Sequence, residues 1–458
     1  MNALANDPKE LPIYERPVLL RHQMGLMNKF GRAVQSRPQT HIDDVPVADL
    51  VARYGSPLFV FSERTLVQKY RGVYQAFARR YPKVRLAWSY KTNYLQAICR
   101  VLHREGAFAE VVSPMEFDKA LRTGVSADHI HFNGPYKPDA ALEQAIRGGA
   151  PLHIDNFDEL VRLERLADKL ALPQRPRVAI RVNLAVEGLP AWSRFGLNLE
   201  TGQAREAADR ILSGGKLDLV GLHCHIGTFI LSPVAYGLAA AKLVDLANDL
   251  RRERGLKLSF IDLGGGFASS NTLREQYLAG EQATPTPERY ADAICNELAR
   301  LDYAPQELPT LVLETGRALV DDAGSLISSV VATKRLPDGR RALVVDAGVN
   351  LLFTAFWYKH EVVPAQDVPG TPEPTVLYGP LCMNIDVLRD SVELPPLGVG
   401  DRVVFRHVGA YNVTQWMQFI TLRPAVVLIG SGGRTAVIRR AERLDDLEAL
   451  EEVPEWLR

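Results

Sequence analysis

The 458-residue sequence predicts an α/β protein in which a closed (β/α)8 barrel of the TIM type is followed by a mainly antiparallel β domain. Two observations predict the barrel. Short apolar runs alternate with longer segments of helical period, which requires parallel strands joined by crossovers. Eight such units occupy roughly 260 residues, a length that suits a closed barrel. An open doubly wound sheet is the alternative, but no G-x-G-x-x-G follows the first strand.

The eight expected barrel strands are short, mostly apolar runs. Helical stretches such as SPMEFDKALRTG, NFDELVRLERLADKLAL and PVAYGLAAAKLVDLANDLRRERG lie between them. The expected strands are RLAWSY (85–90), FAEVV (108–112), HIHFN (129–133), LHIDN (152–156), RVAIRVN (177–183), LVGLHCHIG (219–227), LSFIDLGGG (258–266) and TLVLET (310–315).

The sequence pattern changes after residue 320. Short β-rich runs such as RALVVDAG, DRVVFRHVGAY and RPAVVLIG are separated by Gly, Pro and Asp-Gly turns, a pattern typical of antiparallel sheets. We therefore expect three parts: an N-terminal arm at 1–48, part of which joins the β domain, a barrel at 49–320 and a β-rich domain at 321–458. The acidic tail LDDLEALEEVPEWLR is expected to form a short helix.

The composition is that of an ordinary globular protein. Hydrophobic residues make up 47% of the chain and charged residues 24%, and 54 basic residues balance 54 acidic ones. This balance gives no electrostatic reason to bind nucleic acid or a membrane surface. No apolar run approaches the roughly 18 residues of a spanning helix, and the first residues do not follow the pattern of a signal peptide. Since the four cysteines are also widely spaced, we expect a cytoplasmic protein.

Reactive side chains recur where the expected strands end. In a parallel barrel, functional groups gather at the carboxyl ends of the strands. One lysine alone would be read as a solvated surface charge, whereas the repeated placement predicts a functional site at this rim. The residues at these ends are Lys91, Glu110, Glu116, Arg181, Asn183, His223, His225, Gly264, Gly265, Gly266, Glu314 and Arg317.

The residue types at the rim favour a site for pyridoxal 5′-phosphate. Three consecutive glycines let backbone N–H groups approach an anion closely, and Arg317 can add a charge-assisted bond to the same phosphate. A lysine at the mouth of a barrel can attack a carbonyl, so Lys91 would hold the cofactor as a Schiff base. A carboxylate facing the pyridine nitrogen would keep that nitrogen protonated.

A metal site is the rival interpretation. His223 and His225 alternate along one strand, so both imidazoles could bind one ion. Barrel metallohydrolases use such a pair early in the barrel, with further His and Asp ligands on later strands, whereas this pair belongs to the sixth strand. A second pair, His129 and His131, is explained by strand packing. We therefore predict no metal and expect His225 to stack on the cofactor.

Several motifs along residues 50–450 resemble, in order, those of the fold-type III pyridoxal phosphate decarboxylases, the family of diaminopimelate, ornithine and arginine decarboxylases. SYKTN resembles the lysine motif, and AEVVSPMEF resembles D-V-V-S-x-x-E with Glu110 in place of Asp. SRFG, HCHIGT, DLGGGF and ETGR resemble S-K-F-G, H-x-H-x-G-S, the glycine-rich phosphate loop and E-P-G-R. GPLCMNID resembles G-P-x-C-x-x-x-D, and VGAY resembles the motif whose tyrosine touches the cofactor. Each motif is modest, but the ordered set is highly specific.

The resemblance implies an alanine-racemase-like barrel, pyridoxal 5′-phosphate as the cofactor and a homodimer with shared active sites. It implies four catalytic residues: Lys91 as the Schiff-base lysine, Glu314 on the pyridine nitrogen, His225 stacked on the ring and Cys382 as a general acid entering the neighbouring subunit's site. The cofactor-binding residues that it implies are Lys91, Glu110, Arg181, His225, Thr228, Gly264, Gly265, Gly266, Glu314, Gly316, Arg317 and Tyr411.

Two departures from the family concern the substrate's distal end. Ornithine and diaminopimelate decarboxylases carry an acidic residue after the motif cysteine, where this chain has Met383. Diaminopimelate decarboxylases carry an arginine in N-x-L-x-R-P-x-L-Y, where NLLFTAFWY has Thr354 and keeps Tyr358. The loss of both charged groups predicts a larger, less charged or conjugated amino acid as substrate rather than diaminopimelate. We expect Thr354, Tyr358, Met383 and Asp386 to bind it.

Other functions stay open at this point. Decarboxylation of diaminopimelate is the nearest alternative. An amino-acid racemase would share the cofactor and the barrel, but racemases of this group usually pair the pyridine nitrogen with arginine, whereas Glu314 is a carboxylate. A non-catalytic relative would tend to lose the lysine or the cysteine, and both Lys91 and Cys382 are present.

Overall fold

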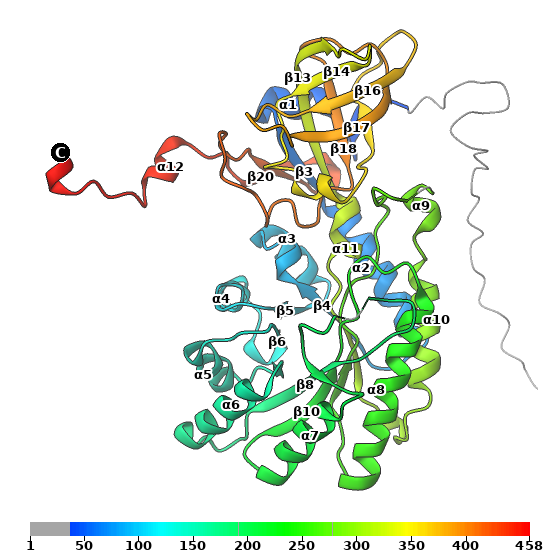
Figure 1. Cartoon of the computed structure of the whole chain (residues 1–458), viewed down its shortest axis with the longest axis vertical. Helices are drawn as coiled ribbons and strands as arrows, with labels where there is room; N and C mark the ends of the chain where they lie inside the picture. Colours follow the sequence, from blue (N-terminus) through cyan, green and yellow to red (C-terminus); the bar gives the residue numbers. More distant parts are fainter. Residues whose placement is uncertain (1–36, 191, 277) are drawn as a thin grey trace, which may run out of the picture. The chain divides into compact units, whose positions relative to one another are not determined.

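Eight parallel strands close into a barrel, as the sequence predicts (Figure 1). In this computed structural model, residues 37–190, 192–276 and 278–458 are described, so most of the expected N-terminal arm lies outside the described residues. The strand order is β10-β11-β12-β4-β5-β6-β7-β8, and pairing of β8 with β10 completes the circle. The strands are β4 (Val84–Ser89), β5 (Phe108–Val111), β6 (Ile130–Phe132), β7 (Leu152–Ile154), β8 (Arg177–Asn183), β10 (Asp218–His223), β11 (Phe260–Asp262) and β12 (Thr310–Leu313), with a short β9 (Leu197–Asn198) beside β8.

Capping residues define where the barrel helices begin and end. Ser62, Ser113 and Asn156 accept hydrogen bonds from the backbone N–H three residues on, which satisfies otherwise unpaired donors at the helix starts. Glycines in the left-handed conformation end several of them, as at Gly124 and Gly255. The barrel helices are α2 (Glu63–Ala78), α3 (Gln96–Arg104), α4 (Pro114–Thr123), α5 (Asp139–Gly148), α6 (Phe157–Leu170), α7 (Gln203–Gly214), α8 (Pro233–Arg254), α9 (Gly280–Ala283), α10 (Pro287–Leu298) and α11 (Arg317–Val320). No helix of the described residues is long and apolar enough to cross a membrane.

A second sheet is mainly antiparallel, as predicted for the C-terminal part. Its path is β17-β16-β14-β13-β3-β19-β20, while β18 pairs with β13 and β15; only β14–β16 and β3–β19 are parallel. The strands are β3 (Leu58–Ser62), β13 (Gly324–Arg335), β14 (Arg341–Val345), β15 (Val362–Pro364), β16 (Glu373–Tyr378), β17 (Val387–Leu394), β18 (Arg402–Arg406), β19 (Val426–Ile429) and β20 (Thr435–Arg439).

Strand β3 differs from the sequence-based expectation. The apolar run at 58–62 precedes the first barrel helix, so we placed it in the barrel segment that begins at residue 49. Instead, β3 pairs with β13 and β19 in the second sheet, and the barrel begins with β4. Just before β3, a small hairpin of β1 (His41–Ile42) and β2 (Val45–Pro46) and helix α1 (Val47–Tyr54) pack against the same sheet through Ile42, Val47 and Leu50.

Short turns of helix complete the chain. The acidic tail begins with the short helix expected there, α12 (Leu444–Glu448), and ends in a 3-10 turn. The 3-10 turns are η1 (Tyr90–Thr92), η2 (Ala127–His129), η3 (Pro305–Glu307), η4 (Asp321–Ala323), η5 (Phe353–Phe356), η6 (Ser431–Gly433) and η7 (Glu455–Leu457).

An ion pair joins the end of the barrel to the second sheet. Asp322 in η4 accepts a hydrogen bond from Nδ1 of His407, which follows β18 (2.9 Å), and also binds the ammonium group of Lys69 in α2. Burial alone would lower the pKa of His407, but its bonds to Asp322 and Glu361 outweigh burial and raise the pKa from 6.5 to about 9. The bonds from His407 and Lys69 lower the pKa of the Asp322 carboxyl, against the opposing effect of burial.

We expect this pair to make stability depend on pH. Since the folded pKa of His407 is raised, its contribution is complete below pH 6.5 and is lost as the pH rises through about 9. The loss is at most on the order of 3 kcal/mol. Urea unfolding of wild type and His407→Asn from pH 6 to pH 10 measures this loss of stability. Asparagine is the replacement because residue 407 has a φ of 55°, which asparagine tolerates. Equal pH slopes for the two proteins would contradict this expectation.

Candidate active site

Lys91 lies in η1, directly after the first barrel strand, and points at a buried carboxylate. Its Nζ is 2.5 Å from Oε2 of Glu110, at the end of the neighbouring strand β5. The parallel register of β4 and β5 places Ser89 opposite Glu110, and the Ser89 hydroxyl donates to the same carboxylate. Burial would lower the pKa of Lys91, but the charges of Glu110 and Glu314 outweigh it and raise that pKa. The lysine is therefore held as a cation at the barrel mouth.

Glu314 lies just beyond β12 and is fully enclosed. Its Oε1 accepts from Nδ2 of Asn133 (2.7 Å) and is 3.4 Å from Nε2 of His223. Its Oε2 is buried without a hydrogen-bond partner. Nearby Asp262 is also buried, and burial together with Glu314 raises its pKa well above the usual value. One carboxylate oxygen of Glu314 is thus anchored, and the other is available to a ligand.

Three histidines line the barrel interior beneath Glu314. Nδ1 of His131 and Nε2 of His153 are 3.1 Å apart, and the His153 and His223 rings lie 4.8 Å apart. Branched aliphatic residues usually fill this part of a barrel. Burial lowers the pKa of His131 to about 4 and the pKa values of His153 and His223 well below 6.5. The row of imidazoles is therefore neutral and supports Glu314 by dipoles.

The three glycines after β11 are required by close approach of neighbouring loops. A Cβ on Gly264 would meet the carbonyl oxygen of Cys224 at 2.6 Å, and one on Gly265 would meet that of Glu314 at 2.3 Å. Gly264 and Gly266 also have φ values of 66° and 89°, which only glycine adopts readily. These loops thus form a cradle of bare backbone between the ends of β10, β11 and β12. Thr228 lies exposed beside the cradle.

Arg317 begins α11 next to this cradle. Its guanidinium lies 4.9 Å from the ring centroid of Tyr358 and 4.8 Å from that of Tyr411, and its Nη1 is buried without a hydrogen-bond partner. Asp321 is 3.8 Å away. Gly316 allows the close approach, since a Cβ there would meet Oγ1 of Thr92 at 2.2 Å. A buried cation with a free donor beside a glycine cradle is a site for an anion such as phosphate.

His225 lies against Gly264 of the cradle and stacks on an aromatic ring of this chain. Its ring is 5.4 Å from that of Trp192 and within 8° of parallel. Burial lowers the pKa of His225 to about 3, so the ring is neutral. Asn183 fixes the Trp192 loop by donating to the carbonyl oxygens of Trp192 and Phe195. Arg181, on the same strand, lies 4.5 Å from the ring centroid of Phe195 and 3.4 Å from Asp155.

The rival metal pair, His223 and His225, is divided between two environments. His223 points into the barrel, whereas His225, beyond the end of β10, stacks on Trp192. His223 instead lies near His153, Asp262 and Glu314, whose ligand atoms all fall within 4.8 Å of one another.

Two of the four expected substrate residues have other partners. Both the N–H and the hydroxyl of Thr354 donate to Oδ1 of Asn412, and the hydroxyl is 2.8 Å from Nε2 of His360. Asp386 accepts from the backbone N–H groups of Val349 and Leu381 (2.8 Å each). Both side chains hold loops together within the chain, and their contact with the substrate stays a prediction.

The other two expected substrate residues, Met383 and Tyr358, differ in exposure. Cys382 is exposed, and Met383 is half-buried beside it. Tyr358 is buried against Phe229 and Arg317, next to the anion site.

Sequence reasoning missed several residues of this site: Asn133, His153, Trp192 and Asp262. A signal existed for His153 and Asp262. Residues that alternate along a strand share a face, so His153 in LHIDN points inward as His131 does in HIHFN. Asp262 ends β11 directly before the glycine run. Asn133 ends the expected strand HIHFN, so the strand-end rule could have found it as well, whereas Trp192 lies in a loop whose path the sequence pattern does not predict.

The residues present fit pyridoxal 5′-phosphate. The glycine cradle and the free Nη1 of Arg317 suit its phosphate, and the free Oε2 of Glu314 suits its pyridine nitrogen. The Lys91 amine at the same mouth suits its aldehyde.

Comparison with known proteins agrees with this fit. Residues 66–321 match the family described as pyridoxal-dependent decarboxylase, pyridoxal binding domain. The chain is 31% identical to the diaminopimelate decarboxylase of Archaeoglobus fulgidus over 91% of this chain and 97% of that protein, and 29% identical to that of Bacillus subtilis over 90% and 94%. The crystal structure of diaminopimelate decarboxylase from M. jannaschii has a TM-score of 0.83 at 29% identity and covers 93% of this chain and 98% of that one. The chain therefore belongs to the fold-type III pyridoxal-dependent decarboxylases and is a pyridoxal 5′-phosphate-dependent amino-acid carboxy-lyase.

Proposed function

We propose that this enzyme decarboxylates an α-amino acid whose distal end lacks the free charged groups of diaminopimelate, with Lys91 carrying the cofactor. The decarboxylase proposal rests on the position of Lys91. Its amine lies beside Glu110, at the same barrel mouth as the Glu314 oxygen that has no hydrogen bond. When bound, pyridoxal 5′-phosphate accepts the electron pair left behind by carbon dioxide.

The residues around the cofactor site have separable tasks. Glu314 keeps a proton on the ring nitrogen, and the neutral histidine row below it does not compete for that proton. The cradle at Gly264–Gly266 and Arg317 fix the phosphate, while Tyr411 packs against the Arg317 guanidinium. His225, supported by Trp192, offers a flat neutral ring for stacking. Lys91, beside Glu110, would hold the cofactor through its amine.

The distal end of the substrate is the basis for the finer proposal. Met383 stands where an acid would hold a distal ammonium, and Thr354 stands where an arginine would hold a distal carboxylate. The Thr354 hydroxyl is already bonded to Asn412 and His360. A desolvated charge without a partner costs several kcal/mol, which is enough to remove a substrate from practical use.

Decarboxylation of diaminopimelate is the second candidate. The relatives of this chain that span nearly their whole length are named diaminopimelate decarboxylases, and one of the solved structures is a complex with L-lysine. Identity near 30% leaves room for a change of substrate.

We further propose a homodimer in which Cys382 reaches into the partner's site. Cys382 is exposed, whereas the other described cysteines, Cys99, Cys224 and Cys295, are buried. A thiol from a second copy would then protonate the carbon that lost carbon dioxide.

Replacing Lys91 tests the cofactor assignment. We expect Lys91→Arg to lower kcat by about 1,000-fold or more, because arginine cannot form the covalent bond. Since arginine keeps a cation beside Glu110, the melting temperature should stay near that of wild type. Borohydride reduction of the loaded wild type, followed by peptide mass analysis, should label position 91. A label on another lysine would reject the assignment.

A carbon dioxide release assay tests the substrate proposal. We expect kcat/KM for meso-diaminopimelate to lie at least about 100-fold below that for the best neutral or conjugated amino acid in the panel. Met383→Glu should raise kcat/KM for diaminopimelate about tenfold or more, because it restores a partner for the distal ammonium. The uncharged control Met383→Gln should leave kcat/KM for diaminopimelate unchanged. Efficient turnover of diaminopimelate by wild type would favour the second candidate.

Mixing inactive subunits tests the shared site. Lys91→Arg and Cys382→Ala should each be inactive alone. Refolded or exchanged mixtures should regain about a quarter of wild-type activity, because a mixed dimer has one site with both residues intact. No recovery in a mixture that exchanges subunits would contradict the proposal.

A further inference from the structure

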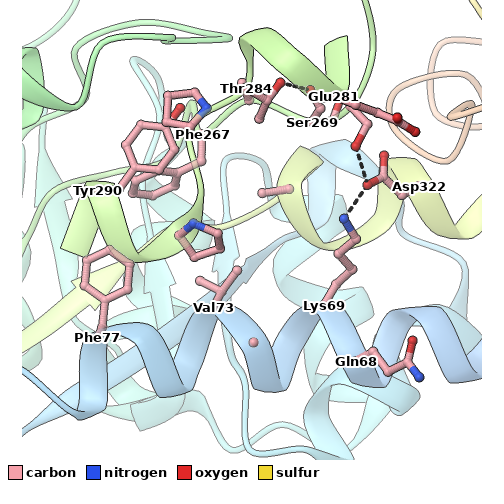
Figure 2. A pocket seen from close by; sticks show the side chains of 16 residues that line it. Gln68, Lys69, Val73, Phe77, Phe267, Ser269, Glu281, Thr284, Tyr290 and Asp322 are labelled. Atoms are coloured by element: carbon pink, nitrogen blue, oxygen red, sulfur yellow. Dashed lines mark hydrogen bonds and ion pairs between the residues drawn. The ribbon is translucent and has the colours of Figure 1, made fainter. Parts of the chain in front are cut away.

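A second cavity lies behind the anion site, outside the barrel mouth. It has a volume of about 270 Å³ and is enclosed by α2, the loop after β11, the segment from α9 to α10, and α11 with η4. Figure 2 shows its lining side chains, with an aromatic group on one side and a polar group on the other. The volume approaches the lower end of the range for small-molecule sites.

The aromatic end is formed by three buried rings. Phe267 is 5.0 Å from Tyr290 and 6.2 Å from Phe77, both in edge-to-face geometry, and Val73 completes the wall. The hydroxyl of Tyr290 donates to the carbonyl oxygen of Ile230, so the cavity meets this ring as an apolar surface. This end suits an aromatic or branched aliphatic side chain.

The polar end offers charges of both signs. Asp322 already accepts hydrogen bonds from Lys69, Ser270 and His407. Lys69 donates one hydrogen bond to Asp322, and an ammonium group can donate three. Glu281, labelled in Figure 2, is exposed and has no hydrogen bond or ion pair with any described residue. A ligand can therefore bring an anion to Lys69 and a cation to Glu281.

Gly72 opens the floor of the cavity. It lies within the 16-residue helix α2, where glycine costs about 1 kcal/mol relative to alanine. A Cβ at this position would meet no atom within 4 Å, so packing does not demand glycine. What the missing side chain does provide is space along the wall between Lys69 and Val73.

We propose that this cavity is an effector site for a small α-amino acid with an apolar side chain. The carboxylate binds Lys69, the ammonium group binds Glu281, and the side chain packs on Phe267 and Tyr290. The cavity wall at 267–270 continues directly from Gly264–Gly266, and Ala318 follows Arg317. An occupant therefore contacts the back of the anion site and changes the affinity for a ligand held there.

The charge assignment is tested by calorimetry on the full-length chain with three matched probes: L-phenylalanine, 3-phenylpropanoate and 2-phenylethylamine. Phenylalanine should bind most tightly. Glu281→Gln is an isosteric change at an exposed side chain. It should weaken the binding of phenylalanine and of phenylethylamine about tenfold and leave the affinity for phenylpropanoate unchanged. Equal effects on all three probes, or none, would overturn the assignment. Repeating the titration in Lys91→Arg separates this cavity from the active site, since its residues do not depend on Lys91.

The location is tested at Gly72. Gly72→Ala should raise the melting temperature slightly, through helix propensity, and keep binding. Gly72→Leu should retain the fold and weaken phenylalanine binding at least tenfold, because its side chain fills the cavity. Unchanged binding in Gly72→Leu would overturn the site.

The effector role has its own readout. Phenylalanine should shift the apparent Kd for pyridoxal 5′-phosphate at least twofold in wild type, and the shift should disappear in Glu281→Gln. Binding without any such shift would reject the coupling. Failure of the Lys91 experiments would reject the proposed function without affecting this site.

Discussion

The structure depends on the burial of three carboxylates in one barrel mouth. Glu110, Asp262 and Glu314 are all at most 2% exposed, and like charges at such depth repel strongly. Lys91 neutralises Glu110, and the pKa of Asp262 rises with burial and with its closeness to Glu314. Oε2 of Glu314 is left without a hydrogen bond, and Glu314 acts together with Glu110 in raising the pKa of Lys91. This one lysine therefore balances more than one buried carboxylate.

This constraint explains features that would otherwise weaken the fold. Three histidines occupy the barrel interior where branched aliphatic residues are usual, and one of them, His223, lies 3.4 Å from Glu314. Gly265 is required for a separate reason: a Cβ there would meet the backbone carbonyl oxygen of Glu314 at 2.3 Å. Stability and cofactor binding are thus served by the same contacts.

The sequence predicted most of the fold because parallel strands and crossover helices leave strong periodic signals. All eight barrel strands were found, and the rim residues from Lys91 to Arg317 follow from the rule that strand ends carry function. Strand β3 was missed because its partners β13 and β19 lie more than 260 residues away, and no local pattern reports such a pairing. The loop residue Trp192, and the internal bonds of Thr354 and Asp386, likewise depend on tertiary contacts.

The cofactor end and the substrate end of the active site therefore differ in how strongly the fold constrains them. The cofactor end is determined by buried charge and by backbone approach, so a change at Glu314, Gly265 or Arg317 would damage both folding and chemistry. In the proposed assignment, the distal end is formed by side chains such as Met383, which lies half-buried beside the exposed Cys382. Substitutions there alter which substrate is stabilised and leave the electron sink intact. A chain of this family can thus keep its reaction while its substrate changes, and the position after the cysteine is where such a change costs least.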